Sequence, residues 1–204
     1  MRFIRLERAW ACCPHYMNYW LLISLCAASG LMMILELRGV PVVLQLPFKG
    51  DIKRESQFLA QFGQAVATVI AAALIYSFEP TQPRKAIAVG ATVIAASLIC
   101  NGLKKIFGRV RPNRENAGKF LGPMLKVNNK HESFPSSHSA CAMALATSLT
   151  ILYPQAGVVF WSLGIITSVL RYLMDAHWPS DVLTGIALGY ALGWAGMRIA
   201  GFTG

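Results

Sequence analysis

Six long apolar segments restrict the fold of this chain more than any other feature of its sequence. Each is close to the ~20 residues that an α-helix needs to cross a hydrocarbon core of ~30 Å. Lipid leaves no partner for backbone polar groups, which favours helices over irregular chain. The chain is also 55% hydrophobic and only 14% charged, as expected inside a membrane. The sequence thus predicts an all-α fold, a polytopic membrane helical bundle with six transmembrane helices at residues 19–37, 58–78, 86–107, 136–153, 156–174 and 181–199.

No internal repeat, low-complexity tract or linker divides this series of segments. We therefore expect a single domain over residues 1–204. Gly185, Gly189 and Gly193 recur every four residues along the last segment, and such a face lets another helix approach closely. We interpret this glycine face as a packing surface.

The N-terminal segment, residues 1–18, carries Arg2, Arg5 and Arg8 at helical spacing among apolar residues. This pattern predicts a short interfacial helix on anionic lipid. A signal peptide is the alternative interpretation. The apolar run that follows continues to Leu37, which is longer than the apolar region of a typical signal peptide. The sequence therefore favours a retained anchor.

The charge of the chain indicates which partners to expect. Its formal net charge is +10, from 19 Lys and Arg against 9 Asp and Glu. In a lipid-bound chain this excess favours anionic partners, namely membrane lipids and a phosphorylated lipid substrate. Nucleic acid is not expected, because no soluble basic domain remains outside the apolar segments. No obligate protein partner is evident, and the five cysteines show neither a disulfide framework nor metal-ligand spacing.

A first group of candidate site residues ends the third apolar segment. Lys104 is separated by six residues from Arg111-Pro112, so a helix end supplies an ammonium and the returning chain supplies a guanidinium suited to phosphate. The alternative is a juxtamembrane basic cluster that binds anionic lipid. We expect Lys105 and Arg109, between these two, to be lipid-facing or solvated.

A second group, Pro135-Ser136-Ser137-His138, opens the fourth segment. A proline in the first turn of a helix predicts that the following backbone N–H groups are free and bind an anion. A serine-rich helix cap is the alternative, and it leaves His138 unexplained. An imidazole there can give a proton to a leaving oxygen.

A third group, Arg171, His177 and Asp181, lies around the turn between the last two segments. We expect Asp181 to accept the Nδ1–H of His177, which leaves Nε2 free as a nucleophile. Arg171 is placed to neutralise phosphoryl oxygens. With six crossings, all three groups fall on the same face of the membrane.

Together these residues resemble a known family. The motifs Lys104-x6-Arg111-Pro112, Pro135-Ser136-Ser137-His138 and Arg171-x5-His177-x3-Asp181 are similar to the three signature motifs of the type 2 phosphatidic acid phosphatases, the PAP2 family. Two positions depart from the family pattern. Ser137 replaces the usual glycine, and Ser168 stands three residues before the arginine instead of beside it.

This resemblance implies a metal-independent lipid phosphate or diphosphate phosphatase without a cofactor. In this scheme the phosphoryl oxygens are bound by Lys104, Arg111, Ser136, Ser137 and Arg171. His177 attacks, Asp181 stabilises the imidazolium, and His138 protonates the leaving oxygen. A lipid phosphotransferase with the same site and a non-enzymatic binder of anionic lipid are the alternatives.

The resemblance also implies a multi-pass protein of the bacterial inner membrane, with its site facing the periplasm or exterior. The positive-inside tendency opposes this orientation. Of the 19 Lys and Arg residues, 6 fall inside and 13 outside in this topology. Phosphate binding accounts for only part of the outer excess.

Overall fold

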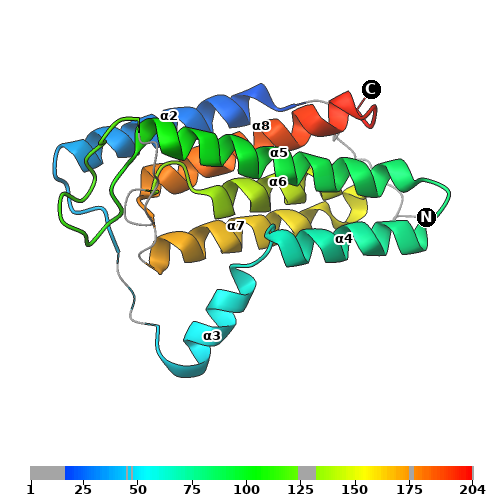
Figure 1. The fold of residues 1–204 in the computed structure, drawn as a ribbon, viewed down its shortest axis with the longest axis horizontal. Coiled ribbons are helices and arrows are strands. Elements are labelled where there is room, and N and C mark those ends of the chain that lie inside the picture. The colour runs from blue at the N-terminus through cyan, green and yellow to red at the C-terminus, as the bar shows by residue number, and fades with distance from the viewer. Residues whose placement is uncertain (1–16, 45, 47, 124–131, 175–176, 204) are drawn as a thin grey trace, which may run out of the picture.

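The computed structural model describes residues 17–44, 46, 48–123, 132–174 and 177–203. Within them the chain is helical, as predicted (Figure 1). The one β-bridge within these ranges joins Arg109 and Phe120. The interfacial helix predicted for residues 1–18 lies outside the described part except for its last two residues. The helices are α2 (Tyr19–Leu37), α3 (Gly50–Leu59), α4 (Ala65–Phe78), α5 (Pro83–Phe107), α6 (Ser137–Leu152), the short 3-10 turn η2 (Pro154–Ala156), α7 (Gly157–Leu173) and α8 (Pro179–Ile199).

In the described part of the chain, four helical segments are long and apolar enough to cross a membrane: α2, α5, α7 with its preceding turn, and α8. Their outward faces carry large apolar side chains such as Ile94, Leu98 and Val158, which are more than half exposed. The chain is therefore a multi-pass membrane protein. Helices α4 and α6 have 14 and 16 residues, which at ~1.5 Å per residue is shorter than a ~30 Å core. Six complete crossings remain a prediction.

The second predicted segment, residues 58–78, is not one helix. Helix α3 ends at Leu59 and projects from the bundle, and α4 begins at Ala65 (Figure 1). Gly63 lies between them with φ +82°, a conformation that favours glycine. A Cβ at Gly63 would lie 2.4 Å from the Cα of Ala142 in α6. The expected helix is interrupted because the chain turns here against the backbone of α6.

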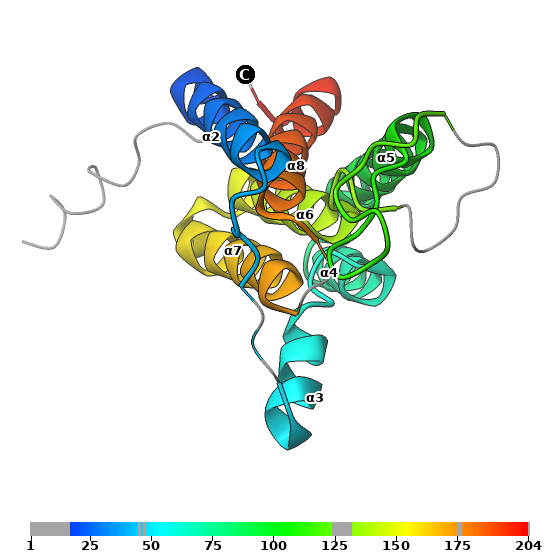
Figure 2. The same cartoon turned by 90° about the vertical axis from the view of Figure 1, so that its left-hand side faces the viewer.

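Helix α6 occupies the centre of the bundle, with α5, α7 and α8 packed around it (Figure 2). Its alanines at 140, 142, 144 and 146 are completely buried. Because alanine has a small side chain, several neighbouring helices can approach α6 closely. The first turn of α6 is therefore enclosed by the ends of the surrounding helices.

The glycine face of α8 packs on α6, as predicted. A Cβ at Gly189 would lie 2.2 Å from the carbonyl oxygen of Ala140, and one at Gly185 would lie 2.6 Å from that of Ser136. At these two positions the backbones of α8 and α6 lie closer together than a Cβ atom would allow. This contact places the N-terminus of α8 beside the N-terminus of α6.

Candidate active site

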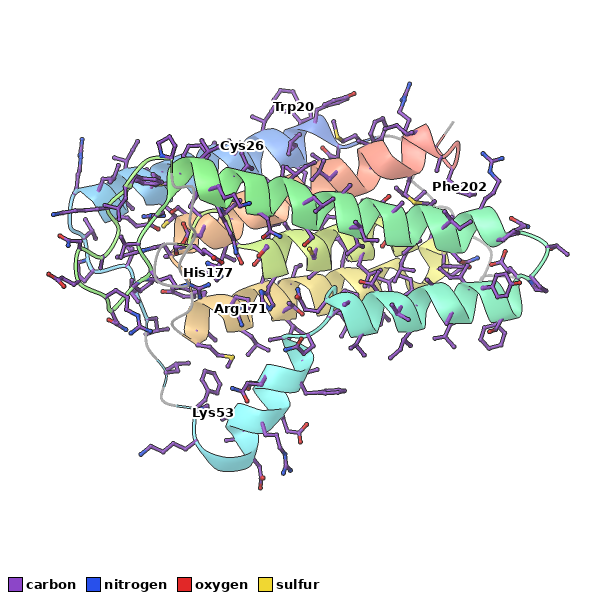
Figure 3. All side chains as sticks on the ribbon, viewed as in Figure 1. Trp20, Cys26, Lys53, Arg171, His177 and Phe202 are labelled. Atoms are coloured by element: carbon purple, nitrogen blue, oxygen red, sulfur yellow. The ribbon has the colours of Figure 1, made fainter. Side chains whose placement is uncertain are left out.

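The three groups of predicted site residues meet at one end of the bundle, the end where Figure 3 labels Arg171 and His177. Lys104 at the end of α5 donates to the Ser137 hydroxyl at the start of α6, over 2.9 Å. The Ser136 amide at the start of α6 donates to the carbonyl of Asp181 in α8, over 3.0 Å. Direct hydrogen bonds therefore join the three motifs.

The three predicted phosphate-binding cations come from separate parts of the chain. Lys104 is buried in the last turn of α5, and Gly108, the C-cap that follows this helix, has the left-handed conformation (φ 56°). The chain then turns back and brings a half-buried Arg111 to the site, while Arg171 lies in the last turn of α7. The charges of all three cations act on His138. Burial lowers the pKa of Arg111, and the carboxylate of Glu132 opposes that shift.

The start of α6 differs in detail from the prediction. Ser136 is the N-cap, and its hydroxyl accepts from the amide of Ser139 at 3.4 Å and pairs with the Ser139 hydroxyl at 2.9 Å. Ser136 is fully buried, and its own amide is bonded to Asp181, so that amide is not free. The amides available to an anion are those of Ser137 and His138, in the first turn, where helical N–H groups have no partner within the helix.

His177 is almost fully buried just before α8 begins. Its Nδ1 lies 2.8 Å from the carbonyl oxygen of Ser133 and 3.8 Å from Asp181 Oδ2. The prediction that Asp181 accepts the Nδ1–H directly is therefore wrong. The carbonyl of Ser133 is the acceptor, and Asp181 acts on the ring through space.

The other ring nitrogen of His177, Nε2, is buried and has no hydrogen-bond partner. Burial lowers the pKa of His177 to about 4, although the neighbouring carboxylate of Asp181 opposes the shift. The ring is therefore neutral near pH 7. A neutral imidazole with Nδ1–H bonded to a carbonyl presents a free electron pair at Nε2, as a nucleophile requires.

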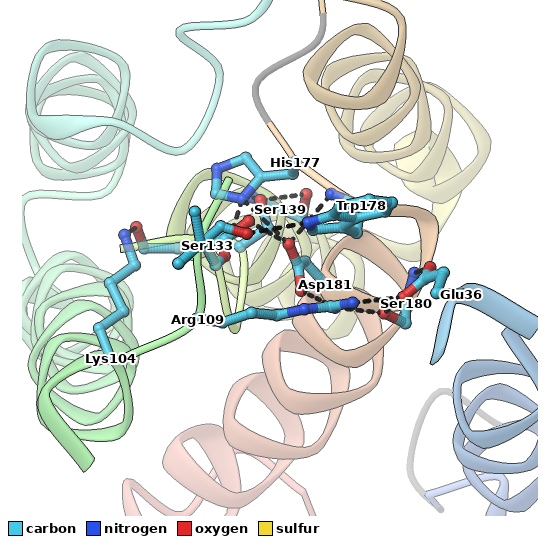
Figure 4. Close-up of polar contacts among 12 residues, drawn as sticks. Glu36, Lys104, Arg109, Ser133, Ser139, His177, Trp178, Ser180 and Asp181 are labelled. Atoms are coloured by element: carbon cyan, nitrogen blue, oxygen red, sulfur yellow. Dashed lines mark hydrogen bonds and ion pairs between the residues drawn. The ribbon is translucent and has the colours of Figure 1, made fainter. Parts of the chain in front are cut away.

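Asp181 is held by groups that no local pattern in the sequence connects with it. Its carboxylate accepts from the Ser133 hydroxyl, from the Trp178 amide at 3.0 Å and from Arg109 at 2.6 Å (Figure 4). Arg109 is completely buried. The expectation that Arg109 is lipid-facing or solvated is therefore wrong, because two carboxylates draw it inside the protein.

Glu36, in the last turn of α2, supplies the second carboxylate. Its Oε2 lies 2.7 Å from Arg109, and it also accepts from the amide and hydroxyl of Ser180. Its side chain is 1% exposed. A signal for this residue was present in the sequence, because Glu36 is the only acidic residue within the first apolar segment. Ionisable residues within such segments usually face the bundle interior and find partners there.

The described residues contain no cluster of three or more His, Cys, Asp or Glu side chains that could hold a metal ion. The positive charge at the site comes instead from Lys104, Arg111, Arg171 and the first turn of α6. Such a set can bind a dianionic phosphoryl group, with one imidazole placed to attack it and a second to exchange a proton.

Similarity to known proteins covers the part of the chain that holds this site. The model of the PAP2 superfamily matches residues 85–203 of the 204. A lipid A 1-phosphatase from Rhizobium etli is 34% identical over 110 residues, covering 53% of this chain and 46% of that protein. A decaprenylphosphoryl-5-phosphoribose phosphatase from Mycobacterium tuberculosis is 30% identical over 143 residues, covering 66% and 73%.

More distant relatives extend the similarity along the chain. An undecaprenyl-diphosphatase from Sulfolobus acidocaldarius is 27% identical over 152 residues, covering 70% of this chain and 68% of that protein. The crystal structure of a PAP2-type phosphatidylglycerolphosphate phosphatase from Bacillus subtilis has the same fold. It is 15% identical with a TM-score of 0.51, covering 89% and 92% of the two chains. The lipid A 1-phosphatases are longer proteins, and this chain spans less than half of their length.

Proposed function

The chain belongs to the PAP2 superfamily, and we propose that it is an integral-membrane phosphatase that hydrolyses a phosphomonoester or diphosphate carried by a lipid. The observation that carries this proposal is the unpartnered Nε2 of His177, buried within range of the charges of Arg111 and Arg171. A buried polar atom without a partner is costly in a folded protein. Its partner here is the phosphorus atom of the substrate.

In the proposed first step, the phosphoryl oxygens are bound by Lys104, Arg111, Arg171, the Ser137 hydroxyl and the free amides in the first turn of α6. Ser136, engaged with Ser139 and Asp181, caps the helix and holds that turn in place. The electron pair of His177 Nε2 forms a bond to phosphorus, and the bond from phosphorus to the lipid oxygen breaks. The bound phosphoryl dianion offsets the three cations, so His138 is protonated in the complex; it gives this proton to that oxygen, and the lipid leaves as an alcohol or a phosphate. The Nδ1–H stays on the Ser133 carbonyl, and Asp181 stabilises the positive ring.

In the second step, water attacks the phosphohistidine. His138, now neutral, takes a proton from the water as its oxygen bonds to phosphorus. The bond from phosphorus to Nε2 breaks, inorganic phosphate leaves, and both histidines return to their starting states. Three cations and a helix terminus supply the charge that this reaction needs, so we propose that it proceeds without a metal.

The substrate is a phosphorylated lipid. The relatives are named for phosphates on lipid A and on polyprenyl carriers, and a phosphate group on a large lipid is common to them. We place lipid A 1-phosphate and a polyprenyl diphosphate first, ahead of phosphatidylglycerophosphate and phosphatidic acid. We further propose that the site faces the periplasm or exterior of a bacterial inner membrane.

The test is phosphate release by the purified full chain from these four lipids, with a chelator present. We expect turnover of at least one lipid and a loss of at least about 10³-fold in His177→Ala. Acid-labile phosphate on the wild-type protein but not on His177→Ala would support the intermediate. Loss of activity on chelation would contradict the metal-free scheme.

Two further results would point to the alternative functions. Transfer of phosphate to a second lipid without release would indicate a phosphotransferase. Binding of the lipids without turnover would indicate a lipid-binding protein.

A further inference from the structure

A buried charge network joins the first helix of the described chain to the N-terminus of α8. The guanidinium of Arg109 lies 2.7 Å from Glu36 and 2.6 Å from Asp181, and all three side chains are at most 1% exposed (Figure 4). Two carboxylates therefore share one guanidinium. A buried carboxylate is costly unless it is paired, so each of the two depends on Arg109.

The position of Arg109 is fixed from several sides. Its guanidinium lies 5.0 Å from the ring of Phe120 and 5.1 Å from that of Trp178, both within the range of a cation–π contact. It also donates to the Ser180 hydroxyl, over 2.7 Å. The planar guanidinium can donate to both carboxylates at once, whereas the single ammonium of a lysine cannot hold both in the same geometry.

The network reaches the nucleophile through Ser133. The amide of Ser133 donates to the carbonyl of Arg109 over 3.0 Å, and its hydroxyl donates to Asp181. The carbonyl of the same residue is the partner of His177 Nδ1. Displacement of Arg109 would therefore move both groups that orient and polarise the ring.

We propose that Glu36 and Arg109 are positioning residues. They act through Asp181 and Ser133 to orient His177 and to set the electrostatic potential at its ring. This inference rests on the proposed role of His177 as nucleophile. It also makes α2 part of the catalytic unit, although Glu36 lies outside residues 85–203, the part that the family model matches.

The charges around His177 predict opposite effects for the two residues. Asp181 faces the ring from α8, Arg171 from α7, Arg111 from the chain after α5, and His138 from α6. Loss of the Arg109 charge leaves Asp181 uncompensated, which favours the protonated ring. Loss of the Glu36 charge leaves Asp181 as the only carboxylate paired with Arg109. The charge of Asp181 is then more fully compensated, which disfavours the protonated ring of His177. A merely structural role would not produce shifts of opposite sign.

The test is an NMR titration of the His177 ring in the detergent-solubilised full chain, assigned by comparison with His177→Ala. We expect Arg109→Gln to raise the pKa of His177 by about one unit and Glu36→Gln to lower it by a similar amount. The double variant should titrate near the wild type, because the two changes offset each other. It also removes one of the two carboxylates that Arg109→Gln leaves without a cation. If Arg109→Gln alone does not fold, the downward shift in Glu36→Gln and its reversal in the double variant still test the proposal.

Kinetics give a second readout. Arg109→Lys keeps the charge but not the double contact, and we expect kcat to fall about tenfold while KM changes less than twofold. The control is Glu79→Gln, which breaks the ion pair with Lys85 at the opposite end of the bundle and should change neither readout. Shifts of the same sign, or none, would overturn the proposal. Opposite shifts in a chain that releases no phosphate from any lipid would leave the positioning intact and refute the phosphatase function.

Discussion

The contact between α8 and α6 allows the role of the fold in catalysis to be tested by one methyl group. In Gly189→Ala the new Cβ would lie 2.2 Å from the carbonyl oxygen of Ala140, whereas ordinary contact begins at 3.4 Å. The neighbouring atoms are backbone and cannot rotate away. The two helices must therefore separate by about 1 Å, and that displacement moves His177 and Asp181 relative to the first turn of α6.

The expected magnitudes follow from this geometry. A displacement of ~1 Å at a catalytic site can cost ~10²-fold in rate, and we expect a similar loss of phosphate release in Gly189→Ala. Overpacking should cost about 1–3 kcal/mol of stability, partly offset by up to ~1 kcal/mol from the better helix propensity of alanine. The matched control is Gly90→Ala in α5, where a Cβ meets nothing within 4 Å. It should keep full activity.

Stability can be followed by the reaction of a fluorogenic thiol reagent with Cys100 and Cys141 during heating. Both are free thiols that are at most 4% exposed, so they react when the bundle opens. Equal activity and equal unfolding temperatures in Gly189→Ala and Gly90→Ala would refute the argument that this close approach aligns the site.

Four further predictions concern charge and hydrogen bonding. Because the pKa of His177 is lowered to about 4, roughly nine-tenths of the nucleophile is neutral at pH 5, against ~3% for an ordinary imidazole. The acid limb of the kcat/KM profile should thus lie well below pH 6, after correction for substrate ionisation measured by 31P NMR. An acid limb near pH 6.5 would contradict this. The free energy of unfolding should also decrease as the pH is lowered from 6.5 to about 4. In this range the unfolded chain binds a proton that the buried ring of His177 does not. Ser137→Gly removes the hydroxyl that lies 2.9 Å from Lys104 Nζ. We expect KM to change about three- to tenfold while kcat is retained. An unchanged KM in phosphate-release assays would exclude a role of this hydroxyl in substrate binding. Glu79→Gln should lower the thermal unfolding temperature without changing phosphate release, because Glu79 binds Lys85 and Tyr153 far from the site; loss of activity would show that the two ends are coupled.

Local sequence determined the parts of this protein that depend on local physics. Apolar segment length predicted the bounds of α2 and came within three residues of those of α5. Glycine spacing predicted the close face of α8, because the absence of a side chain is visible without knowing the neighbour. The motif residues were also identifiable, since phosphate chemistry requires particular side chains at helix ends.

Tertiary structure alone decided which polar groups became partners. Arg109 lies 72 residues from Asp181 and 73 from Glu36, and no local pattern could show that these carboxylates would draw it out of the solvent. The carbonyl of Ser133 displaced Asp181 as the partner of His177 for the same reason, because its position depends on how the chain before α6 returns to α8. The length of an apolar segment follows from local composition, whereas a buried charge is stabilised only by the groups that packing brings to it.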